Sequence, residues 1–359
     1  MSAPECGGRG APARWDRGPR AVRAMIVTMV SVPDGGTARI SVAEARRRLA
    51  TDPFLLLGVE LPEEESPAEE GPAEEGPAEE PVVRRLGLDD EDLEWFGTRD
   101  APPRADFLGE IAGFVVPVVH DAQVVHVHAL ASERYLVVAH RGRRAGLAGD
   151  IRALVRRERP HDAVATLFLL LQEALTTFRR AAVHALLQVE ELEDDMFQGR
   201  RPEQIYRLSQ LRRHSAVLHH ALLPYLQGVD EVITRRMMSR DFPEERQRLA
   251  QEFQRAARLV LADIEALQDA TRRAFASYGS LVAGEQNGVI NRLAIVSVIF
   301  LPLSFLTGFF GMNFEFLTNR LETRDEFWLL AVGLQLVAVV GSLFLLHRSR
   351  IWRRLRDDD

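Results

Sequence analysis

The chain has 359 residues, one cysteine and a formal net charge of -7. This length accommodates a large soluble domain and a small membrane part, while the lone Cys6 excludes an internal disulfide scaffold and a cysteine-rich metal site. The negative charge is local, because Glu60 to Glu80 contains ten Glu and no Lys or Arg. The rest of the chain has 42 acidic against 45 basic residues, so its charge gives no indication of a nucleic-acid partner.

The N-terminal residues 1–36 are rich in Gly, Pro and Arg, which predicts a disordered leader or, alternatively, a true start at Met25 or Met29. The apolar stretch Ala24–Val32 is short and has no small-residue cleavage pattern, so we predict no secretory signal. Pro-Ala-Glu-Glu occurs three times before Pro81. Proline and repelling carboxylates oppose a stable helix, so residues 60–81 are expected to form a solvated acidic insertion.

Residues 37–159 have the mixed pattern of a compact α/β domain. Three short, Val-rich runs bounded by turn residues predict buried strands at Gly113–Val119, Val124–Leu130 and Tyr135–Ala139. Asp89–Phe96 is predicted to form a small helix.

From residue 160 to residue 240 the apolar spacing becomes helical. It predicts one helix over His161–Phe197, a second over Glu203–Leu223 that ends near Pro224, and a shorter one after it. Residues 241–292 are predicted to form a stalk helix, because Glu244–Tyr278 contains neither Gly nor Pro. We expect this helix to continue to Phe310, with a length of ~100 Å at 1.5 Å per residue. A helix of that length requires packing partners along most of its course.

Two charge-free runs near the C-terminus, residues 293–310 and 327–346, are each about long enough to cross a ~30 Å hydrocarbon core. They predict two transmembrane helices joined by an extracytoplasmic loop over residues 311–326. The tail, residues 347–359, is basic, and the positive-inside rule places both termini in the cytoplasm. Because two helices cannot enclose a pore, a channel built from them requires several subunits around an axis.

The end of the first apolar run carries specific motifs. Gly311-Met312-Asn313 closes it, Ile299–Phe314 contains Phe-Leu-Pro-Leu-Ser-Phe, and Glu285–Asn291 precedes it. With these motifs the chain resembles the CorA family of divalent-metal channels closely from Tyr278 onward, and in layout only before that. The resemblance implies an α+β cytoplasmic domain, a very long stalk helix, a two-helix C-terminal transmembrane region and a homopentamer.

The resemblance also implies the function and its residues. The chain would carry hydrated divalent cations, foremost Mg²⁺ and also Co²⁺ and Ni²⁺, across the cytoplasmic membrane, without a cofactor and without enzymatic activity. Asn313 would form a ring of side-chain carbonyls at the outer mouth, with Gly311 and Met312 shaping the turn. The implied pore lining, in which Leu293 and Leu301 form a hydrophobic gate, comprises Asn287, Ile290, Leu293, Leu301 and Ser304.

Each implied pore residue also has a simpler interpretation. Asn287 and Asn291 are compatible with plain interfacial positions, Ser304 with helix packing, and the two leucines with a lipid-facing side.

Departures from the family pattern concern the loop and the stalk. Glu315 and Glu322 are candidates for attracting cations to the outer mouth, although the loop lacks the family's usual Met-Pro-Glu-Leu. Glu252 aligns with a regulatory metal ligand of the stalk, whereas another such position is Ala276, which cannot bind metal. Metal sensing and the identity of the ion therefore stay open, and a ZntB-like zinc transporter is the alternative.

Other candidate sites are weaker. His126 and His128 alternate on a predicted strand, His219 and His220 diverge on a helix, and the acidic helix end over residues 190–195 is typical of a solvated face. Two other function classes are a non-conducting membrane-anchored sensor or scaffold and an enzyme anchored by a helical hairpin. The first needs no Asn ring, and the second needs a catalytic constellation that the sequence does not show.

Overall fold

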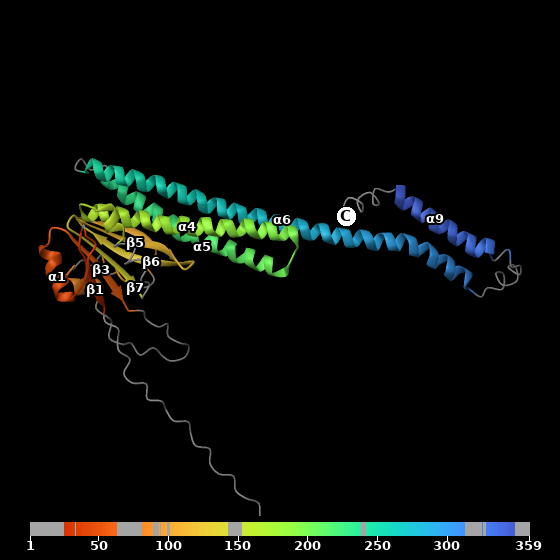
Figure 1. Cartoon of the computed structure of the whole chain (residues 1–359), viewed down its shortest axis with the longest axis horizontal. Helices are drawn as coiled ribbons and strands as arrows, with labels where there is room; N and C mark the ends of the chain where they lie inside the picture. Colours follow the sequence, from red (N-terminus) through yellow and green to blue (C-terminus); the bar gives the residue numbers. More distant parts are fainter. Residues whose placement is uncertain are drawn as a thin grey trace, which may run out of the picture. The chain divides into compact units, whose positions relative to one another are not determined.

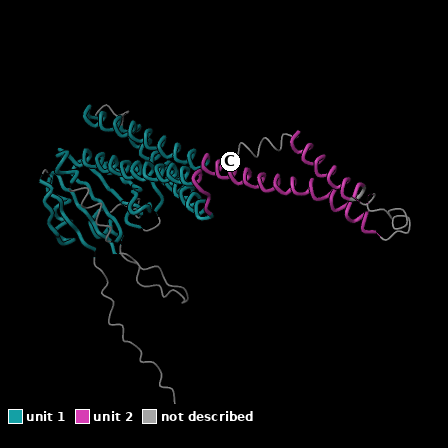
Figure 2. The backbone as a smooth tube through the Cα atoms, turned by 45° about the vertical axis from the view of Figure 1, so that its right-hand side comes forward, with its two compact units in different colours: residues 1–195, 202–272 teal, residues 196–201, 273–359 magenta. Residues whose placement is uncertain are grey.

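The structure of the chain is a computed structural model. It describes residues 25–32, 34–62, 81–88, 93, 95–98, 101–142, 153–237, 242–312, 325 and 328–348. The described elements form an α+β domain, a long helix and a shorter apolar C-terminal helix (Figure 1), as predicted. The chain divides into two compact units, shown in Figure 2: residues 1–195 with 202–272, and residues 196–201 with 273–359.

A seven-stranded sheet is the centre of the first unit, in the order β2-β1-β3-β7-β6-β5-β4. Neighbouring strands are antiparallel except β3 and β7, which pair in parallel from Leu55 beside Tyr135 to Leu61 beside Arg141. The strands are β1 (Ile26–Val30), β2 (Thr37–Ile40), β3 (Leu55–Leu61), β4 (Arg104–Leu108), β5 (Ile111–His120), β6 (Gln123–Ala131) and β7 (Tyr135–Arg141).

The three Val-rich runs are confirmed as β5, β6 and β7. The prediction of a disordered leader over residues 1–36 is wrong at β1, because this strand is paired on both sides and buries Val27 and Val30. The acidic insertion also begins later than predicted. Glu60 and Leu61 belong to β3, and residues 63–80 lie outside the described part of the chain.

Two short helices cover a face of the sheet. Helix α1 (Val42–Thr51) begins at Ser41, whose hydroxyl oxygen accepts a hydrogen bond from the Glu44 N–H at 3.2 Å. Helix α2 (Val82–Leu86) ends at Gly87, whose φ of 73° favours glycine. Both helices share one apolar core with the sheet. The predicted helix over Asp89–Phe96 lies mostly outside the described residues.

Three long helices follow the sheet (Figure 1): α4 (Ala163–Gln198), α5 (Pro202–Met237) and α6 (Glu244–Phe310). The first predicted helix is confirmed as α4. The prediction that the second helix ends near Pro224 is wrong, since α5 continues for thirteen more residues. Leu222, Tyr225 and Val229 are fully buried around the proline, and this packing outweighs the one hydrogen bond that proline removes. The predicted single helix to Phe310 is confirmed as α6.

A part-buried ion-pair network fixes the start of α6 in the first unit. Arg246 donates to both carboxylate oxygens of Glu133, at 2.8 and 2.6 Å, and to Asp162 at 3.0 Å. The Arg246 guanidinium lowers the pKa of the Glu133 carboxyl below its usual value. Arg246 thereby ties α6 to the turn between β6 and β7 and to the residue before α4.

Candidate functional site

The first half of α6 is an ordinary amphipathic helix. Its buried residues recur every three or four positions, which places them on one side of the helix. The Phe253 ring meets the Tyr225 ring of α5 edge-on, with centroids 6.3 Å apart. The buried set is Ala250, Phe253, Ala257, Val260, Ile264, Leu267, Ala270, Thr271 and Ala274.

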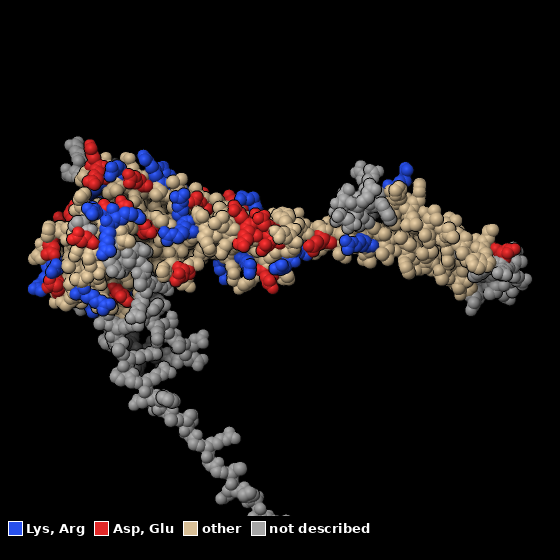
Figure 3. Space-filling model, viewed as in Figure 1, with Lys and Arg blue, Asp and Glu red and all other residues tan. Residues whose placement is uncertain are grey.

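The second half of α6 differs from the first half in the burial of its side chains. None of its residues from Phe275 to Phe310, all of which the structure describes, is buried. Leu293–Phe310 carries no charged residue, and in Figure 3 this end of the helix shows neither acidic nor basic side chains on the visible face. A helix that is apolar all round and unburied requires an apolar environment.

Within the described residues, α6 is the one helix long and apolar enough to cross a membrane. A shorter apolar helix, α9 (Gly333–Arg348), follows the one-turn π-helix η2 (Trp328–Val332). Inside the second unit, the Gln335 side-chain amide of α9 donates to the Thr307 hydroxyl of α6 at 3.2 Å. The sequence analysis missed this contact, although a glutamine in a charge-free run is a signal for helix–helix hydrogen bonding.

The predicted pore-lining residues lie together on one side of the second half of α6. At 100° per residue they occupy an arc of about 120°. All five are exposed within the single chain, with Leu301 at 76% and Leu293 at 65%. The helix continues through Pro302. This arrangement is the one that a pore-facing stripe requires, and the assignment of each residue to a pore remains a prediction.

The Gly-Met-Asn motif begins where α6 ends. The Gly311 N–H donates to the Thr307 carbonyl at 3.0 Å, and the Met312 N–H donates to the Phe309 carbonyl at 3.3 Å. These bonds close the helix at Phe310. Asn313 and the two outer-loop candidates, Glu315 and Glu322, lie outside the described residues.

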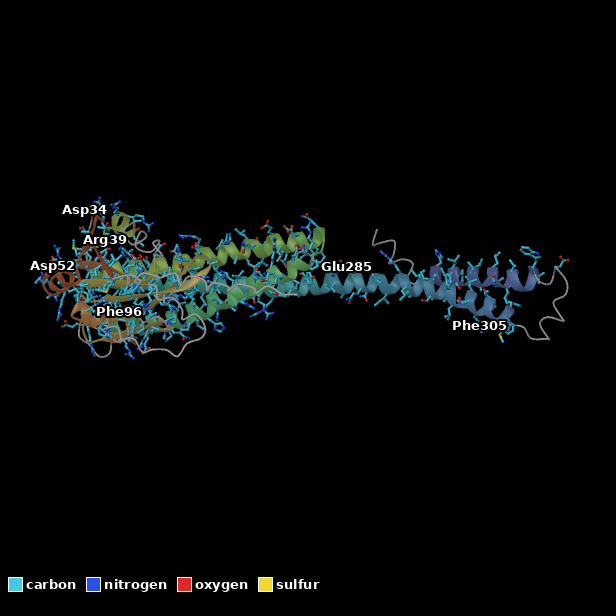
Figure 4. The ribbon with its side chains drawn as sticks, turned by 90° about the horizontal axis from the view of Figure 1, so that it is seen from below. Asp34, Arg39, Asp52, Phe96, Glu285 and Phe305 are labelled. Carbon is cyan, nitrogen blue, oxygen red and sulfur yellow. The ribbon has the colours of Figure 1, made fainter. Side chains whose placement is uncertain are left out.

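Just before the apolar segment, α6 contacts the connection between α4 and α5. Arg200 forms an ion pair with Glu285, and its guanidinium lies 5.8 Å from the centroid of the Tyr278 ring. Figure 4 labels Glu285 near the start of the exposed half and Phe305 near its end. Nothing in the sequence pattern predicted this contact, whose ion pair joins residues 85 positions apart.

The remaining candidates form no metal centre, since no group of three or more His, Cys, Asp or Glu among the described residues is placed to hold an ion. Glu252 is half exposed, and its carboxylate Oε1 lies 3.7 Å from the Nε of Arg248.

The histidine candidates have structural roles or surface positions. His128 is buried and its Nδ1 accepts a hydrogen bond from the Gly97 N–H at 3.1 Å, so it acts in packing. Burial lowers the pKa of His128 to about 4. The rings of His219 and His220 are nearly perpendicular to each other, with centroids 6.0 Å apart.

Comparisons with known proteins agree with these features. A family model described as CorA-like Mg2+ transporter protein matches residues 72–348. The chain is 26% identical over 170 residues to the Cobalt/magnesium transport protein CorA of Thermotoga maritima, which is 46% of each chain. It is 35% identical over 88 residues to the Putative metal ion transporter YfjQ of Bacillus subtilis, 24% of this chain and 27% of that one. The matched segments span less than half the length of these relatives.

Solved structures share the fold. The complete CorA magnesium transporter from Methanocaldococcus jannaschii superposes with a TM-score of 0.68 at 15% identity, over 92% of this chain and 99% of that one. The ZntB cytoplasmic domain from Vibrio parahaemolyticus superposes with a TM-score of 0.51 at 10% identity, over 72% of this chain and 98% of that one. At sequence identities of 15% and 10%, these two comparisons show a shared fold alone.

Proposed function

Since the chain belongs to the CorA family, we propose that it carries hydrated divalent cations, foremost Mg²⁺ and also Co²⁺ and Ni²⁺, across the cytoplasmic membrane. The family consists of transporters and not of enzymes, so the hypothesis of an anchored enzyme is excluded. The observation that carries the proposal is the last part of α6, Leu293–Phe310, which is free of charged residues, contains no buried residue and is closed by Gly311 and Met312.

The proposed selectivity element is Asn313, three residues after α6 ends at Phe310. Mg²⁺ sheds its water reluctantly, so neutral amide oxygens that bind the hydrated ion avoid the cost of stripping it. A ring of such oxygens, one from each subunit, also binds weakly enough to release the ion. Glu315 and Glu322 then raise the local cation concentration at the outer mouth.

Below this ring, the proposed pathway follows the stripe on α6. Leu293 and Leu301 form apolar constrictions, Ser304 and Asn287 offer polar atoms, and Ile290 lies between them. Neither apolar run contains an ionisable residue, so the pathway needs no proton relay. Glu252 is the stalk carboxylate that we assign to regulatory metal contact.

A pore of this kind needs several copies of α6, and we propose a homopentamer. With two spans and a basic tail, both termini and the first unit lie in the cytoplasm. The names of the relatives support Mg²⁺ and Co²⁺ as substrates, and a zinc-transporting activity is the alternative that competition decides.

The test is cation flux into liposomes that hold the purified full chain. We expect Mg²⁺ entry in the wild type and a loss on the order of tenfold in Asn313→Ala, which equals about 1.4 kcal/mol of barrier. The matched control is Asn319→Ala, six residues further along the same loop, which should retain flux. Absent flux would indicate a non-conducting sensor or scaffold. Unchanged flux in Asn313→Ala would contradict the selectivity role.

The same liposomes identify the ion. Competition of Mg²⁺ entry by Co²⁺, Ni²⁺ and Zn²⁺ should rank Zn²⁺ last if the chain is a magnesium transporter. Preferential Zn²⁺ entry would instead establish the zinc alternative.

A further inference from the structure

One arginine of the connection between α4 and α5 contacts α6. Within the second unit, Arg200 pairs with the Glu285 carboxylate and lies over the Tyr278 ring. The Arg200 side chain is only 25% exposed, and its Nη1 is buried without a hydrogen-bond partner among the described residues. The guanidinium is therefore partly desolvated, which strengthens its attraction to a carboxylate and to an aromatic face.

The two α6 residues that Arg200 contacts are seven positions apart. Seven residues are about two helical turns, or ~10.5 Å along the axis, and they bring Tyr278 and Glu285 to the same side of the helix. A single guanidinium thus bridges two successive turns of α6. Its planar shape allows it to stack on the ring and pair with the carboxylate together, which a lysine ammonium cannot do equally well.

The bridged turns are intrinsically weak. Gly279 and Gly284 lie between the two contacts and Gly288 follows them, and glycine is a poor helix former. A Cβ added at any of these three glycines would meet no neighbouring atom within 4 Å. Since no residue after Ala274 is buried in α6, side-chain packing does little to support this stretch of helix in the chain.

We propose that Arg200 is a positioning residue that clamps two turns of α6 and thereby fixes the segment that starts at Asn287. Asn287, the first of the proposed pore-lining residues, follows Glu285 by two positions. The effect of the clamp on transport rests on the proposed function, whereas the clamp itself does not. Tyr278 and Glu285 therefore act as its two anchor points on the helix.

The simpler interpretation is a surface ion pair, which contributes little by itself. Amide hydrogen exchange of the full chain in lipid nanodiscs separates the two interpretations. In Arg200→Gln we expect exchange of the α6 amides from Tyr278 to Ile290 to accelerate by on the order of threefold to tenfold. Arg213→Gln is the matched control, because Arg213 is an exposed arginine of α5 without an ion pair to any described residue.

Further variants make the exchange test specific. Glu285→Gln, on a 59% exposed residue, should accelerate the same amides without any risk to folding. The charge exchange Arg200→Glu with Glu285→Arg should restore only part of the protection, because the ion pair returns whereas the contact with the Tyr278 ring does not. Unchanged exchange in Arg200→Gln, or equal acceleration in Arg213→Gln, would overturn the clamp.

Flux in liposomes then tests the positioning role. Arg200→Gln should change Mg²⁺ entry at least as much as Glu285→Gln, which leaves the contact with Tyr278 in place, and the double variant should change it no further than Arg200→Gln. Faster exchange with unchanged flux would overturn the link to transport. If the wild type conducts no cation at all, the proposed function fails, and the exchange data still decide whether the clamp exists.

Discussion

Between Ala250 and Ala274, α6 buries a residue at nearly every third or fourth position, whereas between Phe275 and Phe310 it buries none. Both halves are helical and both contain many apolar residues, so helix formation and hydrophobicity do not distinguish them. The distribution of apolar residues does. An apolar stripe fits a protein partner of the same chain, while an apolar surface on all sides fits lipid or further copies.

The largest expected effect comes from truncating a buried ring in the first half. Phe253→Ala removes a ring that is 1% exposed and in edge-on contact with Tyr225. We expect a loss of about 3–5 kcal/mol of unfolding free energy, measured by urea unfolding of the detergent-solubilised chain. Phe305→Ala, at a ring 71% exposed in the second half, is the matched control and should cost far less. Equal losses would break the contrast between the two halves.

A charge placed on each half gives the second comparison. Phe300→Lys puts an ammonium group at a position 66% exposed inside the apolar run, at a cost of about 3 kcal/mol for insertion into the membrane. Leu259→Lys, at a position 59% exposed in the first half, carries no such cost. The fraction of chain that resists alkaline extraction from membranes should fall in the first variant only. Equal membrane retention of both variants would contradict the membrane assignment.

An effect of about the same size follows from acidification, which acts on the first unit through histidines that burial keeps neutral. The folded-state pKa of His128 is about 4, below the ordinary 6.5, because burial disfavours its charged form. Between these values the unfolded chain binds a proton that the folded chain does not, so stability falls as pH falls, by about 3 kcal/mol in total. Burial lowers the pKa values of His126, His140 and His214 in the same direction.

Urea unfolding at a series of pH values measures this dependence. His128→Asn keeps a side-chain acceptor for the Gly97 N–H and removes the titrating group, so its stability should fall less steeply from pH 6.5 to 4. His220→Asn, at an exposed histidine of α5, should retain the wild-type slope. Identical slopes in all three proteins would show that His128 does not contribute.

Strong local patterns made much of the fold predictable. The Val-rich runs that became β5, β6 and β7 and the uninterrupted spacing of α6 needed no information from distant residues. Strand β3 was not predicted because its partner β7 lies eighty residues further along the chain, and β1 was not predicted because it follows directly on a Gly-, Pro- and Arg-rich stretch. The continuation of α5 past Pro224 was also not predictable from local sequence, because the burial of Tyr225 depends on contacts with α4 and α6.

The candidate site divides in the same way. The apolar segment Leu293–Phe310 of α6 and its closing Gly311 follow from composition and motif alone, because a long charge-free run allows few alternatives. Arg200 and Glu285 are ordinary charged residues in sequence, and only the fold brings them together. The contact between Gln335 and Thr307 likewise required the pairing of two helices.

The parallel pairing of β3 with β7 has a consequence for the order of folding. The sheet has two antiparallel parts on either side of this pair. One part contains β2, β1 and β3, the other contains β7, β6, β5 and β4, and each is built from strands that are close in sequence. Leu55 meets Tyr135 only across eighty residues, so its closure carries a larger chain-entropy cost than any hairpin. During synthesis the two antiparallel parts can form first, and the sheet becomes one piece only after Arg141 has left the ribosome.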